Sequence, residues 1–217
     1  MRARANDLRG IVNGIDYDVF NPETDPDIVQ NYNAKNFRKE KVKNKRALQE
    51  ELGLARDDKK FMIGIVSRLT SQKGLDLIQC VMDEICTDDV QLVVLGTGDE
   101  NYENMFRHYD WKYHDRVSAQ IYYSEPLSHK IYAACDAFLM PSLFEPCGLS
   151  QLMALRYGTV PIVRETGGLK DTVWPYNEFE GTGTGFSFAN YNAHEMLNII
   201  RYAKHIFYDK KREWNKI

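Results

Sequence analysis

Three charged side chains in this sequence have the type and the position to bind a phosphorylated ligand. Arg68 and Lys73 lie in "SRLTSQKG", which follows the apolar run "FMIGIVS", and Glu145 lies in "LFEPCGLSQ", which follows the apolar run "DAFLMPS". Arg offers a planar fork of donors and Lys a compact charge. Together with the unpaired N–H groups of a helix start, the two cations could bind a diphosphate. A solvated turn is the alternative for these two cations taken alone.

The carboxylate of Glu145 has two interpretations, a helix cap or a ligand-binding group. A capping box needs its acid at the third helical position, whereas Glu145 precedes the expected helix 149–158. Pro146 fixes the turn, and Gly148 lets the backbone approach another group closely. We therefore expect outward-pointing N–H groups near Cys147, Gly148 and Leu149, and both interpretations stay open at this point.

Glycines follow two further apolar runs. "LGTGDENYE" has two glycines at the spacing of a dinucleotide turn, but Asn101 stands where a third glycine would be. A lone G-x-G more often marks a tight turn than a nucleotide cradle, which weakens a nicotinamide-enzyme interpretation. "RETGGLKDTV" places Gly167 and Gly168 after another run.

A pair of tyrosines ends the apolar run "VSAQIYY". Side chains alternate along a strand, so Tyr122 and Tyr123 are expected to face opposite sides of a sheet, and one ring could stack on a base. Core packing of both rings is the alternative. Ser128, before the next helical stretch, is expected to be an N-cap.

The elements that must position these residues follow an alternating pattern. Strands are expected at 61–67, 90–96, 117–123, 136–142 and 159–163, and helices at 73–86, 100–113, 128–135, 149–158 and 192–208. Such continuous apolar strands, joined by helical crossovers, predict an α/β fold with a doubly wound, Rossmann-like parallel sheet covered on both faces. Ligands of such sheets bind beyond the carboxyl ends of the strands, where the residues above lie.

The first part of the chain has a different character. Residues 1–60 are expected to form an interdomain strand and loop followed by a peripheral helical segment, and residues 61–217 a single Rossmann-like domain. "GIVNGIDYDVFNPETD" reads as strand, tight turn and acidic loop. The basic run 36–46 is expected to be the solvated face of a helix.

The composition excludes several classes of protein. The 217 residues are 43% hydrophobic and 27% charged with a net charge of -3, which provides no general field for nucleic acid or an anionic membrane. We find no apolar stretch near the roughly 18 residues of a membrane span and no signal peptide, so a cytoplasmic protein is expected. The cysteines form no C-x-x-C pair and the histidines lack ligand spacing, so no metal is predicted.

Several segments together resemble a known family. "GIVNGIDYDVFNPETD", "SRLTSQKG", "LGTGD", "SEPLSH", "FEPCGLSQLMALRYGT" and "TGGLKDTV", in this order and spacing, resemble the bacterial and plant starch/glycogen synthases that use ADP-glucose. The likeness covers residues 10–208. It implies the carboxy-terminal, donor-binding half of a two-domain GT-B glycosyltransferase, without the amino-terminal half that binds much of the acceptor. It also implies a retaining transfer of glucose to an α-1,4-glucan, with ADP-glucose as substrate and no cofactor.

The resemblance also implies a role for each matching residue. Arg68 and Lys73 would hold the donor diphosphate and stabilise its growing charge, and Glu145 would bind hydroxyls of the transferred glucose. Tyr123 would stack on adenine, and Gly98 would let the nucleoside lie close. The remaining implied contacts are backbone N–H groups of Cys147, Gly148 and Leu149 on the donor, Thr166, Gly167 and Gly168 along the phosphates, and Asn13 on the sugar.

Two positions depart from the family pattern. Met153 stands where many retaining GT-B enzymes have a second glutamate, which fits the starch-synthase branch. Leu143 stands where that branch usually has Arg, so a phosphate or structural contact is expected to be missing.

Two other functions compete with this interpretation. A glycosidase would need a second carboxylate opposite Glu145, and we find no convincing partner for it. A nucleotide-binding module without catalysis would not need a sugar-facing acid. The residues alone do not distinguish ADP from UDP, since stacking on Tyr123 tolerates either base.

Overall fold

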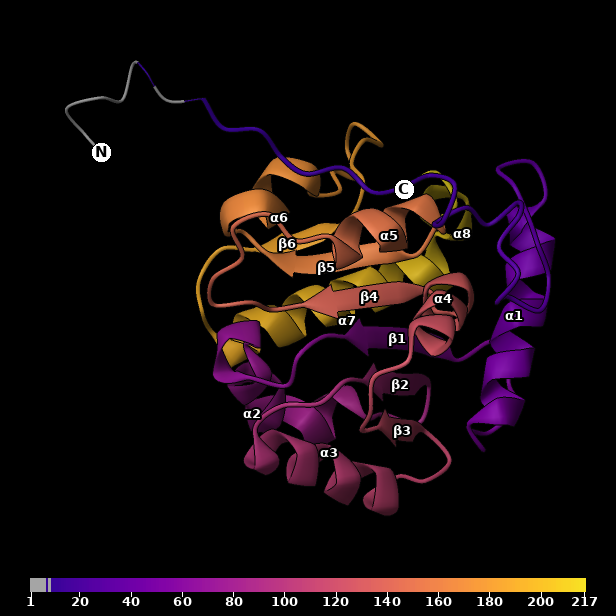
Figure 1. The fold of residues 1–217 in the computed structure, drawn as a ribbon, viewed down its shortest axis with the longest axis vertical. Helices are drawn as coiled ribbons and strands as arrows, with labels where there is room; N and C mark the ends of the chain where they lie inside the picture. The colour runs from indigo at the N-terminus through magenta and orange to yellow at the C-terminus, as the bar shows by residue number, and fades with distance from the viewer. Residues whose placement is uncertain (1–6, 8) are drawn as a thin grey trace.

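The computed structural model describes Asp7 and residues 9–217. In this part of the chain, six parallel strands form one sheet in the order β3-β2-β1-β4-β5-β6 (Figure 1). The strands are β1 (Phe61–Val66), β2 (Val90–Leu95), β3 (Val117–Gln120), β4 (Ala137–Met140), β5 (Val160–Arg164) and β6 (Phe186–Phe188). The order turns back between β1 and β4, which confirms the predicted doubly wound, Rossmann-like sheet.

The centre of the sheet is apolar on both faces. β1 and β2 pair in register from Phe61 opposite Val90 to Val66 opposite Leu95, and nearly every one of their residues is buried. Burial on both faces explains why these strands read as continuous apolar runs. β6 was not predicted, because three residues after a glycine-rich stretch are too short to show strand alternation.

Helices cover both faces of the sheet. α2 (Leu75–Ile85), α3 (Glu100–Lys112) and α7 (Ala193–Asp209) pack on one face, and α1 (Phe37–Glu51), α4 (Glu125–Ala134), α5 (Ser150–Arg156) and α6 (Gly167–Thr172) pack on the other. Figure 1 shows α7 behind the strands and α4 and α5 in front of them. A short helix, α8 (Lys211–Trp214), follows α7, and a 3-10 turn, η2 (Ser71–Lys73), precedes α2.

The start of α4 differs from the expected one. The helix begins at Glu125, and its N-cap is Ser124, whose side-chain oxygen accepts a hydrogen bond from the Leu127 N–H at 3.2 Å. Ser128 lies inside the helix and donates to the Glu125 carbonyl at 2.7 Å. The prediction of Ser128 as the N-cap is therefore wrong.

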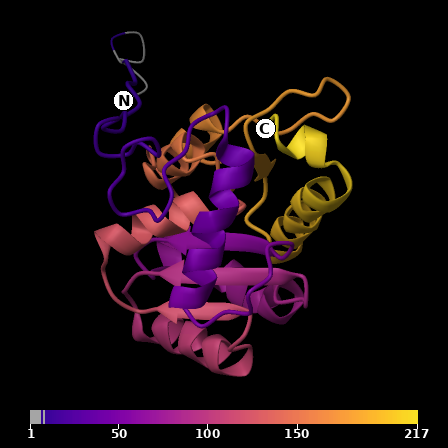
Figure 2. The same cartoon turned by 90° about the vertical axis from the view of Figure 1, so that its right-hand side faces the viewer.

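The basic run of α1 is only partly solvated. Figure 2, viewed from the right-hand side of Figure 1, shows α1 standing in front of the strands. Lys45 is buried and its Nζ lies 2.7 Å from Asp136 Oδ2, while Lys41 Nζ donates to Thr159 Oγ1 at 2.8 Å. The prediction of a solvated face is wrong for these two lysines, because their face of the helix packs on the domain.

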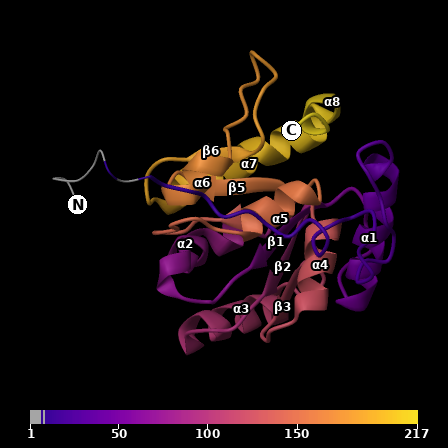
Figure 3. The ribbon, with the colours of Figure 1, turned by 45° about the horizontal axis from the view of Figure 1, so that its top comes forward.

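The segment before α1 lies along the outside of α6 and α5 (Figure 3). Residues 10–16 form no strand, so that expectation is wrong for the described residues. The later part of the segment is anchored by Asp25, whose carboxylate is buried, accepts a hydrogen bond from the Tyr157 hydroxyl and lies 2.7 Å from His129 Nδ1. The division at residue 60 stays a prediction, and residues 1–6 and 8 lie outside the described residues.

Within the described residues, no helix combines the length and the apolar character needed to cross a bilayer.

Candidate functional site

The loops after β1 and β4 are joined at the carboxyl edge of the sheet. The Leu143 N–H donates to the Gln72 carbonyl at 2.9 Å, and Gln72 Nε2 donates to the Phe144 carbonyl at 3.0 Å. Because β1 and β4 are neighbouring parallel strands, these bonds fix the two loops against each other. Residues 72 positions apart in the chain therefore share one rim.

Lys73 and Glu145 meet at this rim. Lys73 Nζ donates to Glu145 Oε2 at 2.6 Å, and the Ser142 hydroxyl donates to the same oxygen at 3.2 Å. Glu145 is only 7% exposed. Among the described residues no N–H group of α5 bonds this carboxylate, and α5 has no side-chain cap, so the geometry does not support the helix-cap interpretation.

Arg68 lies a few residues before Lys73 in the chain, but it lines a pocket that neither Lys73 nor Glu145 lines. This pocket has a volume of about 430 Å³. Its wall includes Arg68, the Gly96–Thr97 turn after β2, Tyr123, and Leu149 before α5. The pair of Lys73 and Glu145 is not part of this wall, so the rim carries two adjacent features, a cation–acid pair and a pocket with Arg68 at its edge.

The two tyrosines differ from their prediction. β3 ends at Gln120, so Tyr122 and Tyr123 lie in the following loop and do not alternate across the sheet. Tyr122 is 46% exposed and Tyr123 84% exposed, and both line the pocket. The strand placement and the core-packing alternative are both wrong, because the strand ends before the aromatic pair.

Gly98 allows close packing between two loops of the site. A Cβ at this position would lie 2.2 Å from the Leu69 carbonyl oxygen, next to Arg68. The Asp99 N–H also donates to the Leu69 carbonyl at 2.7 Å. A glycine at position 98 is thus required for the loop of Arg68 to pack against the turn after β2. This holds whether or not Gly98 also contacts a nucleoside.

The glycine turn after β5 supports the backbone of Glu145. A Cβ on Gly167 would lie 2.1 Å from the Glu145 carbonyl oxygen, and one on Gly168 would lie 2.1 Å from the Cys147 carbonyl oxygen. The Gly168 N–H donates to the Glu145 carbonyl at 3.1 Å. Thr166, half-buried, is the residue before α6. The structure therefore packs Gly167 and Gly168 against the backbone of the loop that carries Glu145.

Asn13 is also brought to this loop. Its backbone N–H donates to the Cys147 sulfur at 3.3 Å, across 134 positions of sequence. Asn13 is exposed, whereas Cys147 is half-buried. The early segment of the chain thus reaches the residues that follow Glu145, as its prediction as a sugar contact requires.

Ser142 and Arg164 contribute to the site and were not predicted. Arg164 Nη1 donates to the carbonyls of Ser142 at 3.2 Å and Leu143 at 2.9 Å, which holds the loop before Glu145. Ser142 is the last residue of the expected strand 136–142. The sequence does contain a signal for Arg164, since a cation that directly follows the apolar run "TVPIV" is expected at the carboxyl edge of the sheet. Met153, where related enzymes have a second acid, forms part of the apolar wall of the pocket.

One group of described residues has metal-ligand spacing. Ligand atoms of Asp25, Asp27 and His129 lie within 4.8 Å of one another. The Asp25 carboxylate already contacts His129 and Tyr157, and none of the predicted site residues belongs to this group. We interpret it as an anchor of the early segment on α4 and α5.

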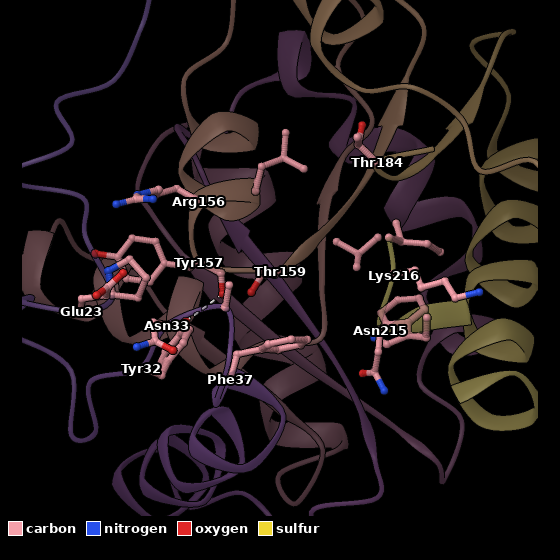
Figure 4. Close-up of a pocket in the computed structure, with 17 residues that line it drawn as sticks. Glu23, Tyr32, Asn33, Phe37, Arg156, Tyr157, Thr159, Thr184, Asn215 and Lys216 are labelled. Atoms are coloured by element: carbon pink, nitrogen blue, oxygen red, sulfur yellow. Dashed lines mark hydrogen bonds between the residues drawn. The ribbon is translucent and has the colours of Figure 1, made fainter. Parts of the chain in front are cut away.

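A further pocket lies at the opposite edge, where β5 begins (Figure 4). It has a volume of about 350 Å³. In Figure 4 Glu23, Asn33 and Arg156 lie on one side, and Asn215 and Lys216 lie on the other. None of the predicted site residues lines it.

Comparisons with known proteins agree on the family of this chain. The family described as "Glycosyl transferases group 1" matches residues 48–216. Proteins named glycogen synthase from Lachnospira eligens and Lachnoclostridium phytofermentans are 78% and 75% identical over all 217 residues. The chain spans about 45% of the length of these curated relatives.

Solved structures show the same fold. The catalytic domain of starch synthase IV from Arabidopsis thaliana, bound to ADP and acarbose, superposes with a TM-score of 0.91 at 35% identity over 99% of this chain and 45% of that chain. The C-terminal domain of a group 1 glycosyl transferase from Francisella tularensis has a TM-score of 0.64 at 15% identity, covering 93% of this chain and 92% of that one. At that identity the likeness concerns the fold alone.

Proposed function

Because the chain belongs to the glycosyl transferases group 1 family, we propose that it is the donor-binding part of a retaining glycosyltransferase that moves glucose from ADP-glucose to the non-reducing end of an α-1,4-glucan. The fold is one half of a GT-B glycosyltransferase, as the sequence predicted. High identity to proteins named glycogen synthase supports the choice of glucan synthesis, and the ADP-bound starch synthase supports the choice of adenine.

The observation that carries this proposal is the contact between Lys73 and Glu145 next to the pocket of Arg68. A sugar nucleotide has a diphosphate beside a ring with hydroxyl groups, so its site needs cations and a hydroxyl-binding acid side by side. Lys73 Nζ and Glu145 Oε2 lie 2.6 Å apart at one rim, with Arg68 in the same loop as Lys73. A site for nucleotide alone would not need the acid.

The charges at this rim fit the chemistry of glucose transfer. As the bond between glucose and diphosphate breaks, negative charge grows on the departing phosphate. Fixed cations stabilise that charge more in the transition state than in the ground state, which increases the rate. In this account Arg68 and Lys73 hold the diphosphate, and Glu145 orients the sugar. The acceptor hydroxyl attacks on the face that the phosphate leaves, its oxygen forms the new bond to glucose, and its proton passes to an oxygen of the departing diphosphate.

The other residues complete the donor site in this proposal. The nucleoside occupies the pocket between Arg68 and Tyr123 beside the turn of Gly98, with the base on the tyrosine ring. Backbone N–H groups of Cys147, Gly148 and Leu149 contact the sugar, and Asn13 approaches it from the early segment. Thr166, Gly167 and Gly168 lie along the phosphates.

The proposal includes partners outside this chain. The acceptor glucan binds largely to an amino-terminal half, so the chain alone is expected to bind the donor but to transfer little glucose. No cofactor takes part, because the leaving diphosphate is stabilised by side chains. We place the enzyme in the cytoplasm, and expect it to bind neither nucleic acid nor membrane.

Titration of the chain with ADP and with ADP-glucose tests the proposal. The wild-type chain is expected to bind ADP-glucose more tightly than ADP, and the Glu145→Ala variant to lose this difference while it keeps its affinity for ADP. Glu165→Ala is a matched control, because Glu165 also lies at the end of a strand but bonds Ser187. Equal affinity of the wild type for both ligands would instead support a nucleotide-binding module.

A further inference from the structure

A buried glutamine lies directly beneath the loop that follows Glu145. Gln151, in the first turn of α5, has an exposed fraction of 0%. Its Nε2 donates to the carbonyls of Cys147 at 3.0 Å and Gly148 at 3.1 Å, and lies 3.1 Å from Thr172 Oγ1. The Thr172 hydroxyl in turn donates to the Gly168 carbonyl at 2.6 Å. One side-chain amide therefore ties the loop after β4 to α6.

These bonds determine which way two backbone N–H groups point. In a trans peptide the carbonyl and the following N–H are fixed in one plane and point in opposite directions. When Gln151 holds the Cys147 carbonyl, the Gly148 N–H must point away from it, and the same applies to the Gly148 carbonyl and the Leu149 N–H. Within the described part of the chain, neither of these N–H groups has an acceptor.

Gly148 is needed for this arrangement. Its φ of +71° lies in the left-handed region, which side chains disfavour. A Cβ at this position would also lie 2.4 Å from Gln151 Oε1, so a larger residue would displace the amide. Gln151 Oε1 is buried, and the described residues provide it with no hydrogen-bond partner. The orientation of the buried amide is therefore set by the contacts of its nitrogen, with the Cys147 and Gly148 carbonyls and Thr172 Oγ1, while its own oxygen stays unpaired.

We propose that Gln151 is a positioning residue, which aims the N–H groups of Gly148 and Leu149 at the sugar of the donor. The inference rests on the proposed function, because the sugar is the ligand assigned to this loop. It explains why the N–H groups of Gly148 and Leu149 point as they do: a side chain that does not touch the ligand fixes their direction by binding the carbonyls of the same loop. Gln151 would otherwise be only a structural tie between α5 and α6.

The chain offers a matched control for a test of this role. Gln49 in α1 is also 0% exposed, and its Nε2 donates to the Asp57 carbonyl at 2.9 Å and to Gln91 Oε1 at 2.7 Å. Its Oε1 likewise has no partner among the described residues. Gln151→Glu and Gln49→Glu therefore make the same change, replacing a donating NH₂ group by a carboxylate oxygen, at two buried places.

Two measurements on the full chain follow from the proposal. In Gln151→Glu the ¹H–¹⁵N signals of Gly148 and Leu149 are expected to shift without any ligand, and the affinity for ADP-glucose to fall about tenfold with the affinity for ADP unchanged. Gln49→Glu is expected to leave these two signals and both affinities unchanged, although it lowers the melting temperature to a similar degree.

Several outcomes would overturn the proposal. Unmoved signals of Gly148 and Leu149 in Gln151→Glu, or an equal loss of affinity for ADP and ADP-glucose, would reduce Gln151 to a structural tie. If Gln151→Glu does not fold, Thr172→Val removes one contact of the amide, and the same signals must shift by a smaller amount. A wild type that does not distinguish ADP-glucose from ADP contradicts the proposed function instead, and the ligand-free signals still test the positioning.

Discussion

A lysine–carboxylate pair lies near each end of the neighbouring strands β1 and β4, and the two pairs differ in how completely they are bonded. Beyond the carboxyl ends of β1 and β4, Lys73 Nζ lies 2.6 Å from Glu145 Oε2. Before their amino ends, Lys45 Nζ lies 2.7 Å from Asp136 Oδ2. By residue type and distance alone the two pairs look alike.

Their remaining partners separate them. Lys45 Nζ also donates to the carbonyls of Asp58, at 3.1 Å, and Lys60, and Asp136 Oδ2 also accepts the Met62 N–H at 2.8 Å. Lys73 Nζ has one acceptor among the described residues, namely Glu145. A fully bonded pair holds the fold together, whereas a pair with unused donors can turn to a ligand. The degree of bonding therefore indicates function better than the presence of an ion pair does.

The largest expected effect is the loss of folding stability when the fully bonded pair of Lys45 and Asp136 is broken. Lys45→Met removes a buried cation and leaves the half-buried Asp136 without it, and we expect the free energy of unfolding to fall by about 3–5 kcal/mol. Urea unfolding would measure it, and the folded fraction should bind ADP with unchanged affinity. A loss below about 1 kcal/mol, the value typical of a surface pair, would contradict the claim that the Lys45–Asp136 pair stabilises the fold more than the Lys73–Glu145 pair does.

The partly bonded pair should respond mainly in catalysis. In a complete two-domain enzyme, Lys73→Met is expected to lower turnover about 100-fold, because a cation that stabilises the leaving group is lost. The stability should fall less than in Lys45→Met, by about 2 kcal/mol, since Lys73 loses one hydrogen bond to a charged group whereas Lys45 loses bonds to three acceptors. Steady-state kinetics and urea unfolding would measure the two changes. Turnover at the wild-type level would show that Lys73 is only a structural partner of Glu145.

A smaller effect is expected for Arg68, which has no part in either pair. Arg68→Ala should weaken ADP binding about tenfold and leave stability unchanged, because the side chain is exposed at the edge of the pocket. Arg107→Ala serves as the control, since Arg107 is exposed in α3 and pairs with Glu103. Calorimetric titration would measure both variants. Identical ADP affinity in Arg68→Ala, Arg107→Ala and wild type would exclude Arg68 from the diphosphate site.

The smallest expected effect is on how folding stability depends on pH through Lys41, which lies near the amino ends of the strands. Burial lowers the pKa of Lys41 from 10.5 to about 8. Between these values the unfolded chain binds more protons than the folded one, so this lysine's destabilising contribution fades as the pH rises. The stability of the wild type relative to Lys41→Met is expected to increase by about 1 kcal/mol from pH 8 to pH 9. A stability difference that stays constant over this interval would contradict the lowered pKa.

The sequence was sufficient where a residue's role depends on its own strand. β1 and β2 read as continuous apolar runs because both faces of them are buried, and Arg68, Lys73 and Glu145 were placed at one edge because parallel strands end together. The sequence failed for Tyr122 and Tyr123, since nothing local marked the end of β3 at Gln120.

Roles that depend on distant contacts were also missed. Lys45 looked like one more cation of a basic run, and its burial is decided by Asp136, which lies 91 positions later. Gln151 looked like an ordinary polar residue of an amphipathic helix. Its bonds to the Cys147 and Gly148 carbonyls depend on the left-handed turn at Gly148, which the sequence suggested only as an unspecified close approach.

A crystal structure of the chain with ADP would test the central claim most directly. We predict that the diphosphate lies within hydrogen-bonding distance of Arg68 and Lys73, that the base rests on Tyr123, and that Lys73 has moved from Glu145 toward a phosphate oxygen. ADP bound instead at the amino edge, in the pocket of Figure 4, with the Lys73–Glu145 contact unchanged, would contradict the account.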